Sequence, residues 1–205
     1  SAGLPDLVYT SWTHGRENAF ELYGPPGTAA MASNVAEAWQ EDNRYRLYGL
    51  EPATPSGWKI NAHEIEEGVV YRDERVTVEA LKVKHGTWPN AFAYKFTTPD
   101  KVIVISGDAA YDPKLEAMAT GADILIHEVV SEAALNQRSE FWQNYHRSNH
   151  TTSYERAALA SRAKPKQLIL YHVLVFGLED ETVLQEVKSR YDGTVILAED
   201  LDIYE

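Results

Sequence analysis

The chain has 205 residues, with 31 acidic against 19 basic side chains, a net charge of −12 and no cysteine. Because 44% of the residues are hydrophobic, the chain can bury a core, and wholesale disorder is excluded. The absence of cysteine excludes disulfides, thiolate zinc sites, iron–sulfur clusters and cysteine nucleophiles, and the acidic balance argues against a broad nucleic-acid-binding surface.

No hydrophobic run approaches the ~18 residues of a membrane-spanning helix. No basic and then apolar segment at the N-terminus marks an export signal either. The sequence therefore predicts a soluble, acidic, globular protein, and a cytoplasmic location is favoured.

The first part of the chain contains two predicted turns with one predicted helix between them. Proline and glycine gather in residues 23–27 and 51–57, a composition typical of turns. Thr28 can cap a helix that extends to about Tyr45, because apolar residues recur there at helical spacing.

The rest of the chain predicts a sheet covered by helices. Short β-branched segments predict strands at 60–65, 69–71, 76–84, 91–97 and 102–106, the last two as a hairpin. Strands are then expected at 123–127, 167–172 and 194–198, helices at 113–119, 131–144, 153–163 and 180–191, and a polar loop at 145–152. Strands first and alternating elements later predict an α/β fold.

Four of the predicted strands end in side chains that suit metal binding or catalysis. These ends carry His85, Asp108, the pair His127–Glu128, and His172. Since ligands of α/β sheets lie beyond the carboxyl ends of strands, such residues can share one site. A single histidine at a strand end is usually an ordinary hydrogen-bonded residue. For histidine and aspartate at four strand ends, a shared functional site and separate structural roles are about equally probable.

The chemistry that these residues can share is metal-assisted hydrolysis. Imidazole and carboxylate are the ligands of zinc, manganese or iron in a protein without thiolates. A bridging carboxylate can hold two ions, which generate hydroxide near neutral pH and stabilise the attacking and leaving oxygens. His85, Asp108 and His172 supply only three ligands, which is too few to complete two metal sites.

His150 is a second candidate, because it stands just before the Thr-Thr-Ser start of a predicted helix. A loop side chain at this position can point into a cleft. A solvated loop histidine is the alternative for His150, and it is the better interpretation of His146. A carboxylate beside His150 would support the protonated ring as an acid, and Glu128 is the candidate partner. Neighbours on a strand face opposite ways, so only one of His127 and Glu128 can face the cleft unless the strand has ended.

Seven short stretches, in order along the chain, carry a family resemblance. They are GLPDL (3–7), YGPPGT (23–28), VKHGTWPNAFAYKF (83–96), SGDAAY (106–111), ADILIHEV (122–129), HTTSYERAALA (150–160) and LILYH (168–172). In this order and spacing they resemble the metallo-β-lactamase superfamily, in the branch of ribonuclease Z, arylsulfatase-like and related phosphodiesterase-like hydrolases. The resemblance implies a metallo-β-lactamase-like αββα sandwich, N-terminally incomplete, formed as a single partial domain over residues 1–205.

The resemblance also implies roles for the candidate residues. His85 is expected to bind one metal ion, Asp108 to bridge both and His172 to bind the other. Zinc is the expected metal, with manganese or iron as alternatives. His150 is expected to donate a proton to the leaving group, with Glu128 as its orienting partner, so the expected catalytic residues are His150, Glu128 and Asp108.

Other residues near these motifs receive lesser roles from the same resemblance. His127 becomes a structural residue, and His14 and His63 lie outside the site. Gly86 and Gly107, each beside an expected ligand, fit close packing of the backbone at the metal cleft.

The sequence departs from the family pattern in two places. The motif His-x-His-x-Asp-His, which supplies ligands to both metals just before the Gly-Leu-Pro segment, does not occur, and that segment begins at Gly3. The chain therefore resembles a family member cut just after its principal metal motif, and we expect its own activity to be impaired or absent. Ala109 stands where relatives commonly have threonine, which keeps Asp108 and removes a neighbouring hydroxyl.

Two functions compete. The first is a metal-dependent hydrolase that cleaves a phosphodiester or related ester by metal-activated hydroxide. The second is a non-catalytic α/β binding or assembly module, in which exposed apolar surface favours a homodimer.

The substrate class is open within the enzyme hypothesis. A small-molecule ester or phosphodiester and the 3′ end of transfer RNA are the alternatives, and the charge of −12 disfavours nucleic acid. No membrane partner is expected. Aromatic residues near the motifs either line a pocket or pack in the core: Trp88, Phe92, Trp142, Tyr145 and Phe176.

Overall fold

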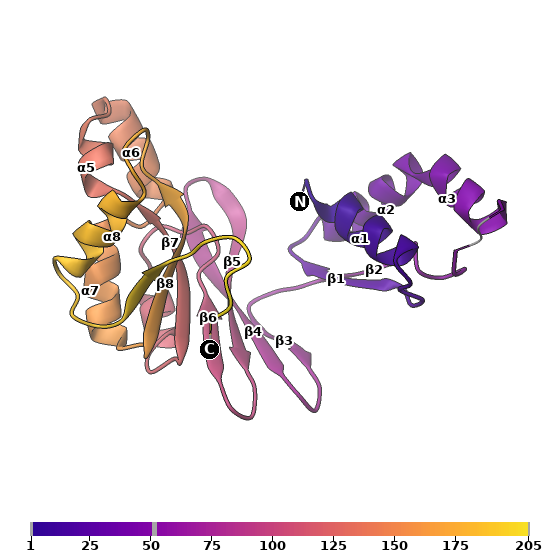
Figure 1. The fold of residues 1–205 in the computed structure, drawn as a ribbon, viewed down its shortest axis with the longest axis horizontal. Helices are drawn as coiled ribbons and strands as arrows, with labels where there is room; N and C mark the ends of the chain where they lie inside the picture. Colours follow the sequence, from indigo (N-terminus) through magenta and orange to yellow (C-terminus); the bar gives the residue numbers. More distant parts are fainter. Residues whose placement is uncertain (1, 51–52, 205) are drawn as a thin grey trace. The chain divides into compact units, whose positions relative to one another are not determined.

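The computed structural model describes residues 2–50 and 53–204, and the chain divides into two compact units between Glu66 and Glu67. Each unit has a sheet of its own, of two strands in the first and seven in the second (Figure 1). The single domain expected over residues 1–205 stays a prediction. Within the described part of the chain, no helix combines the length and the apolar composition that crossing a membrane requires.

The first unit contains three helices and a pair of parallel strands. The helices are α1 (Leu4–Thr13), α2 (Thr28–Ala38) and α3 (Gln40–Tyr48), and the strands are β1 (Phe20–Gly24) and β2 (Ile60–Glu64). Its core is formed by the buried side chains of α1, which are Leu4, Val8, Tyr9 and Trp12. Their spacing of about four residues is the helical signal that could have predicted α1.

The prediction of one helix from Thr28 to about Tyr45 is partly wrong, because the helix breaks at Trp39 and resumes as α3. Thr28 begins the helix without capping it, and its hydroxyl donates to the Pro25 carbonyl. Of the turn expected over 51–57, residues 51 and 52 lie outside the described part of the chain.

The second unit is built on a mixed sheet in the order β3-β4-β5-β6-β7-β8-β9, antiparallel from β3 to β6 and parallel from β6 to β9. The strands are β3 (Gly68–Arg72), β4 (Thr77–His85), β5 (Trp88–Thr97), β6 (Val102–Ile105), β7 (Ile124–Val130), β8 (Gln167–Leu174) and β9 (Val195–Leu197). The parallel half carries most of the site, because its strands begin at one edge and end at the other.

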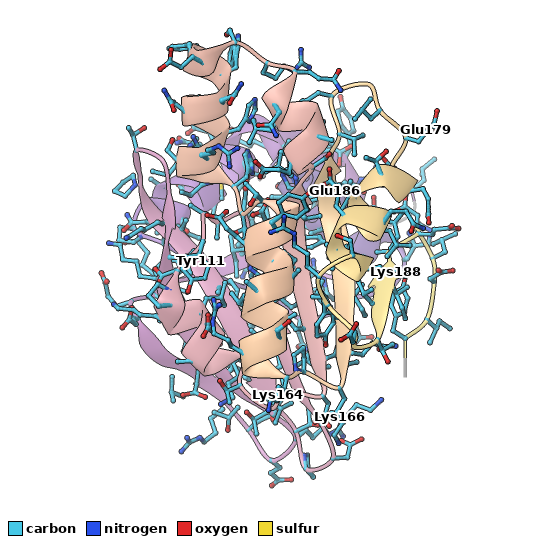
Figure 2. All side chains as sticks on the ribbon, turned by 90° about the vertical axis from the view of Figure 1, so that its left-hand side faces the viewer. Tyr111, Lys164, Lys166, Glu179, Glu186 and Lys188 are labelled. Atoms are coloured by element: carbon cyan, nitrogen blue, oxygen red, sulfur yellow. The ribbon has the colours of Figure 1, made fainter. Side chains whose placement is uncertain are left out.

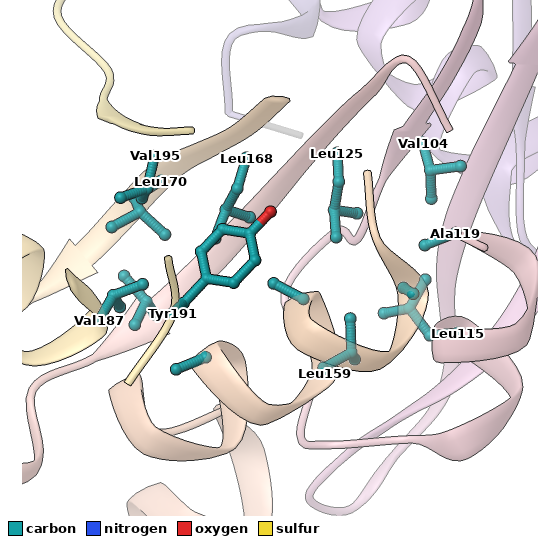
Figure 3. Close-up of a cluster of buried hydrophobic side chains, with 14 of the residues drawn as sticks. Val104, Leu115, Ala119, Leu125, Leu159, Leu168, Leu170, Val187, Tyr191 and Val195 are labelled. Atoms are coloured by element: carbon teal, nitrogen blue, oxygen red, sulfur yellow. The ribbon is translucent and has the colours of Figure 1, made fainter. Parts of the chain in front are cut away.

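Five helices accompany this sheet, and they are α4 (Pro113–Met118), α5 (Glu132–Asn136), α6 (Glu140–Asn149), α7 (Ser153–Ala163) and α8 (Glu181–Lys188). Helices α7 and α8 lie on one face of the parallel strands (Figure 1). Leu115 of α4 and Leu159 of α7 face Leu125 of β7 and Leu168 of β8 in the buried cluster that fixes this layer (Figure 3). The predicted α/β fold is confirmed.

The helix predicted at 131–144 is two helices, and the loop predicted at 145–152 is helical as far as Asn149. Ser131 caps α5 by accepting from the Ala134 N–H. The buried carboxylate of Glu186, a residue of α8 (Figure 2), accepts from the first two N–H groups of α5. The polar composition of residues 146–149 was misleading, because they form the last turn of α6, where the side chains of Ser148 and Asn149 donate to the Tyr145 carbonyl.

Two strand ends also differ from the prediction. Strand β7 continues to Val130, so His127 and Glu128 lie inside it, and β8 continues past His172 to Leu174. Glu128 pairs with Tyr171 and Val129 with Val173, which leaves His172 as an extra residue of β8 with a left-handed φ of 45°. This bulge turns the His172 side chain away from its regular alternation along the strand.

Candidate active site

Three histidine side chains of the second unit converge on the carboxylate of Asp108. Nε2 of His85 lies 3.3 Å and Nε2 of His172 lies 3.5 Å from Oδ2, while Nδ1 of His150 lies 2.9 Å from Oδ1. His85 lies at the end of β4, and Asp108 lies in the loop after β6. His150 directly follows α6, and His172 forms the bulge in β8. Residues separated by up to 87 positions in the chain thus share one locus, as the family resemblance implied (172 − 85 = 87).

Two glycines allow the chain to carry these side chains so close together. Gly86 and Gly107 have φ angles of 53° and 63°, a region that side chains with a Cβ disfavour. A Cβ on Gly86 would collide with the side chain of Asn149, and one on Gly107 with the carbonyl of Phe92. The expected close packing of the backbone beside His85 and Asp108 is therefore present.

His85 is held so that its Nε2 faces Asp108. Its Nδ1 lies 2.9 Å from the backbone carbonyl of Asn149, and a carbonyl only accepts, so Nδ1 carries the hydrogen. In the neutral ring the Nε2 lone pair then faces a carboxylate oxygen, an arrangement that a bound metal ion or a proton on Nε2 would stabilise. Orientation of an imidazole by a backbone carbonyl on its other nitrogen is typical of metal ligands.

Asp108 has a second feature that fits a cation. Its Oδ1 is buried, and no described residue gives it a directed hydrogen bond, because the Nδ1–H of His150 points to Glu128 instead. Burial raises the pKa of Asp108, but the hydrogen-bonding contact and charge of His150, with the charges of His85 and His172, outweigh this and lower the pKa below its usual value. An ionised carboxylate beside the Nε2 atoms of His85 and His172 is a donor set that suits zinc, manganese or iron.

Glu128 orients His150 from below the site. It is fully buried, its Oε1 accepts the Thr151 N–H at 2.6 Å, and its Oε2 accepts the His150 Nδ1–H at 3.2 Å. Thr151 is fixed in turn by its hydroxyl, which donates to the Ala109 carbonyl. The side-chain pairing of Glu128 with His150 that the sequence proposed is present, and it leaves Nε2 of His150 free of these contacts.

A compact group of possible ligand atoms, all within 4.8 Å of one another, comes from Asp108, Glu128 and His150. This set differs from the ligands expected from the resemblance. The Nδ1–H of His150, which bonds Glu128 and lies 2.9 Å from Asp108 Oδ1, accounts for this closeness without a metal, whereas the two Nε2 atoms beside Asp108 Oδ2 fit a bound cation. His85, Asp108 and His172 therefore remain the ligand candidates.

His127 is buried behind the site and does not reach it. Its Nδ1 donates to the Glu128 carbonyl at 2.8 Å, and its Nε2 contacts the guanidinium of Arg156, which is also fully buried. Burial, with the charge of Arg156 as a further cause, lowers the pKa of His127 well below its usual value. A neutral, fully bonded ring is the structural role that the sequence predicted.

His146 does not behave as the solvated loop histidine that the sequence favoured. It lies on α6, with its ring centroid 5.6 Å from that of His150 and 4.5 Å from that of Phe176. His14 and His63 belong to the first unit, where His63 contacts Glu21 at 2.6 Å.

A cavity of about 350 Å³ adjoins the site, and its lining residues are Arg138, Trp142, His146 and Phe176. Two of the aromatic residues singled out from the sequence thus line a pocket. Phe92 is buried, while Trp88 and Tyr145 are exposed. The pocket was missed as a unit because its residues come from the α5–α6 connection, from α6 and from the loop after β8.

The metal-free protein is expected to lose stability as the pH rises from about 6.5 to 9. Burial lowers the pKa of His150, but hydrogen bonds and the charges of Asp108 and Glu128 outweigh it and raise the pKa to about 9, from a usual 6.5. The folded state therefore binds a proton more tightly than the unfolded state. The resulting stability is fully present below pH 6.5 and is lost as the pH passes 9, by up to about 3 kcal/mol. Urea unfolding in the presence of a chelator measures this, and His150→Gln should flatten the profile; an unchanged profile in that variant contradicts the assignment.

Comparisons with known proteins agree with the fold. A family model described as a β-lactamase superfamily domain matches residues 1–173. A ribonuclease Z of Mycobacterium sp. (strain KMS) is 30% identical over 179 residues, which are 84% of this chain and 61% of that protein, so the chain spans about three fifths of this relative's length. A ribonuclease Z of Shouchella clausii is 25% identical, with 99% of this chain and 74% of the relative covered.

Solved structures give the same result for the fold. The metallo-β-lactamase fold protein YhfI from Bacillus subtilis matches with a TM-score of 0.69 and 18% identity, over 100% of this chain and 72% of the other. Human tRNase Z, short form, matches with a TM-score of 0.65 and 20% identity, over 100% and 73%. The metallo-β-lactamase-like αββα architecture expected from the sequence is confirmed at the level of the fold.

Proposed function

Because the chain belongs to the metallo-β-lactamase superfamily, as the match over residues 1–173 shows, we propose that it is a metal-dependent hydrolase of phosphodiester or related ester bonds. The observation that carries this proposal is the convergence of His85 Nε2 and His172 Nε2 on one carboxylate oxygen of Asp108. Two imidazole nitrogens beside one carboxylate oxygen are a donor set that would suit a metal centre, where a bound ion would activate water for hydrolysis.

Zinc is the metal proposed for this centre, since the chain offers imidazole and carboxylate but no thiolate. His85, Asp108 and His172 would hold it, with Asp108 shared where two ions are bound. Bound there, zinc supplies Lewis-acid stabilisation of the phosphoryl oxygens and an activated water nucleophile. If two ions share these three side chains, each ion has about two protein ligands. Weak metal affinity and low activity are therefore proposed for these 205 residues.

His150 is the proposed proton donor to the leaving oxygen. Glu128 holds its Nδ1–H at 3.2 Å, which fixes the ring and leaves Nε2 to carry the proton that is transferred. Glu128 itself is buried and bonded to the Thr151 N–H, so it acts as a positioning residue. Asp108 contacts the same ring from the ligand side, which couples the donor to the metal centre.

Two substrate classes fit this chemistry. The net charge of −12 favours a small phosphodiester or ester, because binding an RNA backbone requires an excess of Lys and Arg. The name ribonuclease Z carried by the relatives favours the 3′ end of a transfer RNA. A non-catalytic binding or assembly module, self-associated as a homodimer, is the alternative to both.

The test is to load the chain with zinc and measure the bound metal together with hydrolysis of bis(4-nitrophenyl) phosphate and of a transfer-RNA precursor with a 3′ extension. Metal-dependent cleavage of the first alone supports the small-substrate proposal, and cleavage of the second supports the RNA candidate. At saturating zinc, no bound ion and no cleavage above the level of the chelated protein would contradict the hydrolase proposal. Size-exclusion chromatography of the same sample then tests self-association.

A further inference from the structure

The pocket of Arg138, Trp142, His146 and Phe176 lies directly beside the proposed proton donor. The ring centroid of His146, on the pocket wall, is 5.6 Å from that of His150. The volume of about 350 Å³ is enough for a single aromatic ring system. Only the ring of His146 thus stands between a group bound in the pocket and His150, the proposed proton donor to the leaving oxygen.

The walls of this pocket are aromatic. The His146 centroid lies 4.5 Å from that of Phe176 and 5.9 Å from that of Trp142, with which its ring is nearly parallel at 29°. Trp142 and His146 form a stacked pair, the Phe176 ring is tilted by 44° against His146, and a flat ligand ring can pack against such aromatic faces.

Trp142 remains 48% exposed on α6, although tryptophan is among the side chains that gain most from burial. A large exposed aromatic side chain on the wall of a cavity is typical of a ligand-binding surface. Phe176 adopts a left-handed φ of 48°, which costs a residue with a Cβ about 1 kcal/mol. The loop after β8 keeps this ring in the pocket despite that cost.

One cation borders the aromatic walls. The guanidinium carbon of Arg138 lies 4.7 Å from the Phe176 ring centroid, a cation–π arrangement. In residues 2–50 and 53–204, no carboxylate forms an ion pair with Arg138, unlike Arg147, which pairs with Glu132. Arg138 is therefore available to an anionic group of a ligand.

We propose that this pocket binds an aromatic ring carried by the leaving group of the substrate, with Arg138 facing a negative charge next to that ring. The inference rests on the proposed function for the reaction at Asp108 and adds the class of leaving group. His146 on the pocket wall neighbours His150, whose ring contacts Asp108, so a ring bound in the pocket would lie next to the proposed proton donor. An aryl phosphodiester and a nucleoside both present such a ring next to a phosphate.

The test compares two monoesters that share charge and approximate size and differ in aromaticity, phenyl phosphate and cyclohexyl phosphate. Binding to the zinc-loaded chain is measured by isothermal titration calorimetry, which needs no turnover. We expect phenyl phosphate to bind roughly fivefold more tightly. Trp142→Ala and Phe176→Ala should each reduce this ratio towards one, and Trp142→Phe should restore most of it. Tyr48→Ala is the control, because Tyr48 is an 83% exposed aromatic residue of the first unit that does not line the pocket.

Equal affinity for the two monoesters, or an unchanged ratio in both alanine variants, would overturn the inference. Adenosine 5′-monophosphate in the same assay separates the two ligand sources, since it binds more tightly than phenyl phosphate only if the pocket takes a nucleoside. Discrimination between the monoesters without any hydrolysis would refute the proposed function and leave the pocket assignment standing. Hydrolysis of the phosphodiester with equal affinity for the two monoesters would refute the pocket assignment and leave the proposed function standing.

Discussion

Asp108→Asn is expected to remove metal binding and, with it, any hydrolytic activity of the chain. The substitution keeps the shape of the side chain and removes the charge on which three imidazoles converge. Loss of residues that only support metal ligands already costs roughly 10- to 100-fold in metal affinity, so loss of the shared ligand should exceed that range. Activity should fall by more than about 10³-fold, since several kcal/mol of charge stabilisation are removed. Zinc content after dialysis and the rate of phosphodiester hydrolysis measure the two effects.

Asp112→Asn is the matched control for this variant. Asp112 is a buried aspartate four residues further on, and its side chain caps α4 by accepting from the Lys114 N–H, a role that asparagine can also fill. The control should keep the zinc content of the parent chain. Equal zinc content in Asp108→Asn and Asp112→Asn would show that Asp108 is not a ligand.

His150→Ala is expected to slow hydrolysis in a way that depends on the leaving group. A proton donor contributes about 10²- to 10⁴-fold where the leaving oxygen is basic, and little where the leaving group is already stable as an anion. The rate constant should therefore fall strongly for a diester with an alkyl leaving group and only slightly for one that releases 4-nitrophenolate. Steady-state kinetics on the two substrates measure the difference.

His14→Ala serves as the control, because His14 is a histidine of the first unit that contacts only its own helix end. It should leave both rate constants unchanged. If His150→Ala lowered both rate constants by the same factor, proton donation would be the wrong role, and His150 would instead belong to the metal centre through its contact with Asp108.

The sequence predicted those parts of the fold that depend on local signals. Helix α7 has the bounds expected from its Thr-Thr-Ser start, and the structure shows why: Thr152 and Glu155 form a reciprocal capping box. His85 and Asp108 were placed correctly at a strand end and in the loop beyond a strand, because short apolar runs bounded by polar residues identify buried strands.

The parts that failed depend on tertiary contacts. The bulge that places His172 has no signal in the sequence LILYH, since it arises from the register of β8 against β7. Glu128 looked like a strand-end residue, yet it is buried inside β7, where the backbone of Thr151 and the ring of His150 satisfy its oxygens. Local patterning cannot show that a buried carboxylate finds partners from another segment.

Helix α6 is a second case in which tertiary contacts, which the sequence does not reveal, determine the site. Its first half was predicted as a helix and its second half, from Tyr145, as a loop, and its aromatic side chains had no assigned face until the loop after β8 brought Phe176 beside His146. The sequence could name Trp142 and Phe176 as pocket candidates. It could not join them, because 34 positions separate them along the chain (176 − 142 = 34).

The most direct test of the proposed metal centre is anomalous diffraction at the zinc edge from crystals of the zinc-soaked chain. We expect a peak bordered by Asp108 Oδ2 and by Nε2 of His85, of His172, or of each where two peaks occur. A peak held by Glu128 and His150 alone, or zinc bound only elsewhere on the chain, would contradict the assignment.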